Sequence, residues 1–148
     1  MPLAKHPGPA KPRVISKAQL GRQLAAAAGD GDLALMTKLL TLGAPVNCQN
    51  TRGETPLNFA AAWNEAAAAK LLLERGADPN LPDKTGGTAL MLAAQHGSAT
   101  LVKLLLKHKA DADAKDKAGN SVLAHADWRE GNDRDQVREL IRKAVRAL

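Results

Sequence analysis

A repeat with a period of 33 residues runs through most of this chain and restricts its fold more than any other feature. The Thr-Pro-Leu sequence at 55–57 recurs as Thr-Ala-Leu at 88–90, and the Leu-Leu pair at 72–73 recurs at 105–106. Gly53 recurs one and two periods later, at positions 86 and 119. Self-similarity at this spacing indicates an array of small structural units, each of which buries its apolar surface against its neighbours.

Each unit contains signals for two helices. Thr55 can cap a helix in which proline occupies the first position, and Asn64 then interrupts the pattern before a second helix over 65–75. Gly76 follows as a left-handed terminator. The same reading predicts helix pairs at about 16–28 with 33–42 and at 88–96 with 100–108. A degraded pair follows Ser121, with a break near 131–133.

Lys109 departs from this pattern because it stands where the other units have the terminating glycine. Either this lysine adopts a left-handed conformation or the preceding helix ends differently. A left-handed conformation costs a non-glycine residue about 1 kcal/mol.

Thr-Pro-Leu opening one helix, two alanines after it, a double leucine in the second helix and Gly-Ala closing the unit resemble the ankyrin repeat. The resemblance implies an all-α ankyrin-repeat solenoid of four helix pairs joined by short β-hairpin-like loops, with helical capping repeats at both ends. We expect a disordered basic tail over residues 1–15 and the ankyrin repeat domain over 16–148. Its units would span about 16–47, 48–80, 81–113 and 114–148.

The net charge of +6 is concentrated at the two ends of the chain. Residues 1–23 contribute +5, residues 129–148 contribute +2, and the repeat body between them contributes −1. A flexible basic tail usually keeps a protein soluble, and we favour that role here. The alternative is that the tail binds nucleic acid or another anionic surface electrostatically.

The sequence contains no pattern typical of catalysis or of metal binding. The acidic run at 111–116 lacks the glycine and the final glutamate of a calcium loop. The histidines at 96, 108 and 125 lack the spacing of a helical zinc site, and Cys48 has no second thiol beside it in sequence. We therefore predict that the chain is not an enzyme and that it uses no cofactor and no metal.

The family resemblance implies that partners contact the hairpin tips and the exposed side of the first helix of each pair, which together form a concave face. The predicted partner-binding residues are Arg52, Glu54, Asn58, Trp63, Lys84, Thr85, Met91, Gln95, His96, Lys115, Lys117, Trp128 and Arg129. Trp63 could alternatively pack over its own helix, and Trp128 could shield the end of the stack. The cations at the tips favour a protein partner with an acidic surface.

Two further features concern where the protein acts. No apolar run approaches the length of about 20 residues that is needed to cross a bilayer, and the first 17 residues do not resemble a secretory signal. The single cysteine is compatible with a reducing compartment. We expect a cytoplasmic, monomeric protein that binds another protein.

Overall fold

The computed structural model describes residues 14–96, 98–128 and 133–148. Residues 1–13 of the predicted tail, residues 131–132 of the predicted break and Arg129 therefore lie outside the described residues. Eight helices in the described part form four pairs: α1 (Lys17–Asp30) with α2 (Leu33–Thr41), α3 (Pro56–Ala62) with α4 (Ala66–Glu74), α5 (Ala89–Gln95) with α6 (Ala99–Lys107), and α7 (Val122–Ala126) with α8 (Arg134–Arg146).

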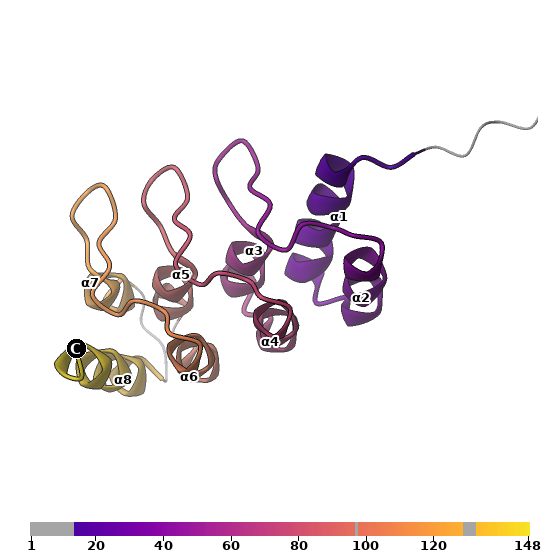
Figure 1. Ribbon diagram of the computed structural model, residues 1–148. Helices are drawn as coiled ribbons and strands as arrows, with labels where there is room; N and C mark the ends of the chain where they lie inside the picture. The colour runs from indigo at the N-terminus through magenta and orange to yellow at the C-terminus, as the bar shows by residue number, and fades with distance from the viewer. Residues whose placement is uncertain (1–13, 97, 129–132) are drawn as a thin grey trace, which may run out of the picture.

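The pairs stack side by side in two layers (Figure 1). Helices α1, α3, α5 and α7 form the inner layer, and α2, α4, α6 and α8 form the outer layer. Leucine and alanine fill the core between them, and the alanine pairs at 60–61 and 93–94 are almost completely buried. Small side chains let neighbouring helices approach closely, which suits a core with few aromatic residues. The predicted all-α solenoid of four helix pairs is confirmed.

Side-chain caps begin every inner helix, as the sequence predicts. The hydroxyl groups of Thr55, Thr88 and Ser121 each accept a hydrogen bond from the backbone N–H three residues later. Ser16 and Gln19 form the expected capping box at the start of α1. Because these hydroxyls bind N–H groups that have no partner within the helix, they fix the residue at which each inner helix begins.

The predicted helix ends agree with the structure to within one residue, except at the end of α1. Helix α1 continues through Gly29 to Asp30, where we expected it to end near Ala28. Gly31 is the left-handed residue, with φ of 69°, and its N–H donates back to the carbonyl groups at the end of α1. Lys109 adopts the left-handed conformation, with φ of 67°.

A hairpin projects from the start of α3, α5 and α7, at residues 49–54, 82–87 and 115–120 respectively (Figure 1). Asn50 and Asp83 accept hydrogen bonds from two backbone N–H groups each within their own hairpin. Asp116 accepts one in the third hairpin. One backbone hydrogen bond of 2.9 Å joins each hairpin to the next, from Lys84 N–H to the Arg52 carbonyl group and from Lys117 N–H to that of Thr85.

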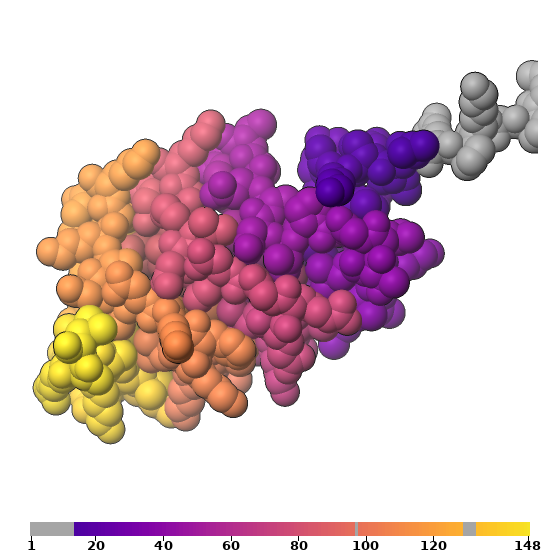
Figure 2. Space-filling model, in the orientation of Figure 1, coloured from indigo at the N-terminus to yellow at the C-terminus, as the bar shows by residue number. Residues whose placement is uncertain are grey.

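Glycine is required where the hairpins meet. Gly53 and Gly86 have φ of 77° and 82°, and a Cβ added to them would lie 2.9 Å and 2.8 Å from a backbone nitrogen of the next hairpin. Gly119 has the same conformation but no atom within 4 Å of such a Cβ, because the described residues place no further hairpin beside it. The hairpins thus form a row whose last member is open. Figure 2 shows this row as a continuous edge, separated from α1 by a notch.

Candidate functional site

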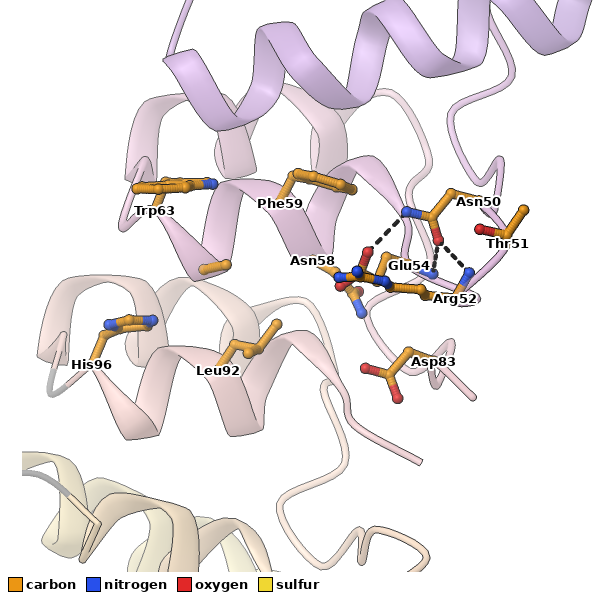
Figure 3. A pocket seen from close by; sticks show the side chains of 11 residues that line it. Asn50, Thr51, Arg52, Glu54, Asn58, Phe59, Trp63, Asp83, Leu92 and His96 are labelled. Atoms are coloured by element: carbon orange, nitrogen blue, oxygen red, sulfur yellow. Dashed lines mark hydrogen bonds between the residues drawn. The ribbon is translucent and has the colours of Figure 1, made fainter. Parts of the chain in front are cut away.

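The inner helices and the hairpins together form one face of the solenoid, on which two hollows lie. This is the face that we expected to be concave, and it is here called the concave face. A hollow of about 550 Å³, here called the first hollow, lies on this face between α3, α5 and the first two hairpins (Figure 3). It is lined by Asn50, Thr51, Arg52, Glu54, Asn58, Phe59, Ala62, Trp63, Asp83, Leu92 and His96.

The walls of the first hollow come from two neighbouring inner helices. Phe59 and Trp63 lie one helical turn apart on α3, and Leu92 and His96 occupy the equivalent positions on α5. Trp63 is the C-cap residue of α3 and is 68% exposed. A Cβ added to Gly29 would lie 3.0 Å from Cδ1 of Trp63, so the indole ring lies beside the end of α1.

The floor of the first hollow includes Asn58, which we expected on the exposed side of α3. The structure corrects this expectation, because Asn58 is only 3% exposed. Its Oδ1 accepts a hydrogen bond of 2.8 Å from the Thr55 hydroxyl group, while its buried Nδ2 has no partner. Met91, one period later, is 1% exposed, so the same correction applies to it. Both residues lie in the first turn of an inner helix, which neighbouring units cover.

Among the described residues, the rim of the first hollow combines one cation that forms no ion pair with carboxylates that accept hydrogen bonds. Arg52 is exposed at the hairpin tip and, within the described residues, forms no ion pair. The Glu54 carboxylate accepts a hydrogen bond of 2.8 Å from Asn50 Nδ2. The Asp83 carboxylate accepts from Thr85 N–H and Gly87 N–H, at 2.8 and 2.9 Å. The acidic residues that interleave with the cations in the sequence therefore serve partly to shape the hairpins.

A second hollow of about 600 Å³ occupies the equivalent place one unit later, between α5, α7 and the last two hairpins. Trp128 at its edge is 54% exposed, and its ring packs against that of His125 with centroids 4.3 Å apart. His125 is buried and places Nε2 2.9 Å from Oδ2 of Asp116. The Asn120 N–H that donates to the Asp116 carboxylate, aided by the hydrogen bond with His125, lowers the pKa of Asp116.

The structure brings most of the predicted partner-binding residues to one face. Glu54, Gln95 and His96 are half-buried. Lys115 lines neither hollow and forms an isolated β-bridge with Ser121. The exposed members of the predicted set are Arg52, Trp63, Lys84, Thr85, Lys115, Lys117 and Trp128.

The sequence analysis missed several residues that shape the two hollows. Phe59, Leu92 and His125 share one register position in the inner helices, and each lines a hollow. Positions 50, 83 and 116 hold Asn, Asp and Asp, which are residue types that organise turns through their own side chains. The period of 33 residues was the signal that could have identified both sets.

The described residues include no group of three or more His, Cys, Asp or Glu side chains that could hold a metal ion. Burial raises the pKa of the Cys48 thiol, which disfavours the reactive thiolate. None of the helices in this part of the chain is long and apolar enough to cross a membrane.

Comparison with known families agrees with this architecture. The family model described as ankyrin repeats (3 copies) matches residues 24–116 and 61–145, which together cover most of the chain. No curated protein gives a significant match. With four stacked helix pairs, a period of 33 residues and hairpins between the units, the chain belongs to the ankyrin-repeat family.

Proposed function

We propose that this protein binds another protein through its concave face, with the inner helices and hairpin tips in contact with the partner. Ankyrin repeats are generally protein–protein interaction modules. The observation that carries the proposal is Trp63, a tryptophan with 68% of its surface exposed at the edge of a hollow. Tryptophan is enriched among the residues that dominate binding energy at protein interfaces.

Electrostatics favours a partner whose surface is acidic. Arg52, Lys84 and Lys117 are exposed at the tips of the three hairpins. The carboxylates of Asp83 and Asp116 accept hydrogen bonds from their own hairpins and are less exposed than these cations. The hairpin tips therefore present exposed cations to a partner, which increases the rate of association with an acidic surface and selects against basic ones.

The test is a pull-down from the cells that produce the protein, at low and at moderate salt. The baits are the intact protein, a form without residues 1–13, and Trp63→Ala. Deletion up to residue 13 keeps Ser16 and its capping box at the start of α1. Lys70→Ala, an exposed substitution on the outer helix α4, is the matched control.

We expect a discrete protein that the intact, truncated and Lys70→Ala baits retain at both salt concentrations and that Trp63→Ala loses. Capture of nucleic acid alone, lost with salt or with the tail, would contradict the proposal. That result would support the tail as an electrostatic binding element.

A further inference from the structure

We propose that the first hollow binds a peptide segment in which an aromatic or long aliphatic side chain lies within one or two residues of a carboxylate. This inference rests on the proposed function and deepens it, because it states what part of the partner binds and at which place on the concave face. Three features of the first hollow lead to it.

The first feature is an apolar slot between two inner helices. Phe59 and Trp63 line it from α3, and Leu92 lines it from α5 (Figure 3). Trp63 contacts Gly29 of α1, so α1 supports the ring in the unbound protein. Most of the surface of Trp63 nevertheless remains exposed. A ring that is already placed loses little conformational freedom on binding, so an apolar side chain entering the slot gains the burial energy at low entropic cost.

The second feature is the guanidinium group of Arg52 at the polar end of the hollow. Arg52 has no ion pair within the described residues, while the nearby Glu54 carboxylate is hydrogen-bonded to Asn50. Arginine can bind a carboxylate with two parallel hydrogen bonds, which gives both orientation and energy. A carboxylate of the peptide is therefore the group that Arg52 suits.

The third feature is the Asn58 side chain at the floor between these two ends. Its Nδ2 is buried and has no hydrogen-bond partner, although its Oδ1 is bound to Thr55. A buried donor without a partner destabilises the unbound protein, because it has lost its hydrogen bonds to water. An acceptor on the ligand, such as a peptide carbonyl group, would remove this cost once the floor adjusts to admit it. An extended peptide supplies such acceptors at every residue.

The charges in this hollow favour a peptide over a nucleic acid. Among the described residues, Arg52 is the only arginine or lysine in the lining of the first hollow, and the Glu54 and Asp83 carboxylates in the same lining already accept hydrogen bonds from the hairpins. A nucleic-acid backbone requires several cations along its path, and this lining supplies one. A single carboxylate beside an apolar side chain requires only one cation.

The experiment is a selection from a displayed library of random 12-residue peptides on the full chain. Enriched peptides are synthesised and titrated into Trp128→Phe protein, in which Trp63 is the remaining tryptophan and its fluorescence reports on the first hollow. Arg52→Glu is the test variant. Lys84→Glu is the matched control, because Lys84 is equally a hairpin cation but lines the second hollow. Urea unfolding checks that each variant is folded.

We expect enriched peptides to pair Phe, Trp or Leu with a nearby Asp or Glu, and to change Trp63 emission saturably. Arg52→Glu should weaken their binding by about tenfold or more, and Lys84→Glu by about threefold or less. Enriched peptides that lack either feature, or that bind Arg52→Glu as well as the parent protein, would overturn the inference.

Two outcomes separate this inference from the proposed function. If the selected peptides leave Trp63 emission unchanged and lose affinity with Lys84→Glu, the concave face remains the binding face but the first hollow is not the site. If no peptide is enriched, the inference fails. The pull-down with the Trp63→Ala bait then decides the proposed function by itself.

Discussion

The two hollows on the concave face have the same backbone, one period apart, but they present different side chains. Buried Asn58 forms the floor of the first, and buried Met91 takes that place in the second. At the hairpin tip, Arg52 of the first hollow corresponds to Thr85 of the second. Hydrogen bonds and glycine conformations recur in both hollows, whereas the side chains that a ligand would meet do not.

The two tryptophans extend this contrast. Trp128 packs on buried His125, so part of its surface already has a partner within the chain. Trp63 is more exposed and lies beside a glycine. The comparison indicates that residues common to the units build the frame, and that residues particular to one unit determine what binds there.

The largest effect on stability should come from exchanging the residues that form the floors of the two hollows. Met91→Asn places an amide at a site that is 1% exposed, and we expect it to lower the free energy of unfolding by about 2–4 kcal/mol. Asn58→Met should change it by less than about 1 kcal/mol, because the variant loses the bond with Thr55 but removes the unpaired Nδ2. Urea unfolding measures both values. Equal losses of unfolding free energy in the two variants would contradict the difference that we describe between the floors of the two hollows.

The next effect concerns the glycines of the hairpin row. Gly86→Ala and Gly119→Ala both force alanine to a positive φ, at a cost of about 1–2 kcal/mol. Gly86→Ala should cost clearly more, because its Cβ would lie 2.8 Å from Lys117 N, whereas the Cβ at position 119 meets no atom. Thermal unfolding of the two variants compares them. A larger loss of stability for Gly119→Ala than for Gly86→Ala would contradict the expected clash between the second and third hairpins.

Replacing either tryptophan with alanine should change the free energy of unfolding by less than the glycine substitutions do. Trp128→Ala removes the ring contact with His125 and should lower the free energy of unfolding by about 1 kcal/mol. Trp63→Ala should lower it by less than about 0.5 kcal/mol, since most of the ring is already exposed. Chemical denaturation measures the free energy of unfolding of both variants. A larger loss for Trp63→Ala than for Trp128→Ala would show that Trp63 mainly packs against the rest of the chain.

The smallest effect should be a difference in acid sensitivity between the hairpins. The folded protein lowers the pKa of Asp116, so the stability that this carboxylate contributes is present above its ordinary pKa. It is lost as the pH falls from about 4 through the lowered value. Asn50 holds the corresponding place in the first hairpin and does not titrate.

Asp116→Asn should therefore reduce the fall in unfolding free energy between about pH 5 and pH 2.5, compared with the parent chain. Urea unfolding at several pH values provides the measurement. An unchanged pH profile would show that Asp116 contributes nothing to acid sensitivity.

The sequence could predict the frame because the frame depends on local chemistry. Thr55 and Thr88 cap their helices as expected, and Lys109 adopts the left-handed conformation of the glycine that it replaces. These outcomes follow from a few neighbouring residues and from the period, both of which are visible in a single sequence.

The site was harder to predict because burial depends on neighbouring units. The register places Asn58 and Met91 in an inner helix but does not show what covers its first turn. Similarly, Asp83 and Asp116 adjoin the hairpin lysines in the sequence, whereas in the structure they accept backbone hydrogen bonds. These hydrogen bonds depend on the conformation of the hairpin, which the sequence analysis did not predict.

The central claim, that a partner protein sits on the concave face, is tested most directly by photocrosslinking. A photoreactive phenylalanine analogue at position 51, exposed in the first hairpin and in the lining of the first hollow, leaves Trp63 intact. It is compared with the same analogue at position 70, on the outer helix α4. We predict one discrete adduct with a protein from position 51 and none from position 70. An adduct that forms from position 70 alone would contradict the claim and place the partner on the outer face.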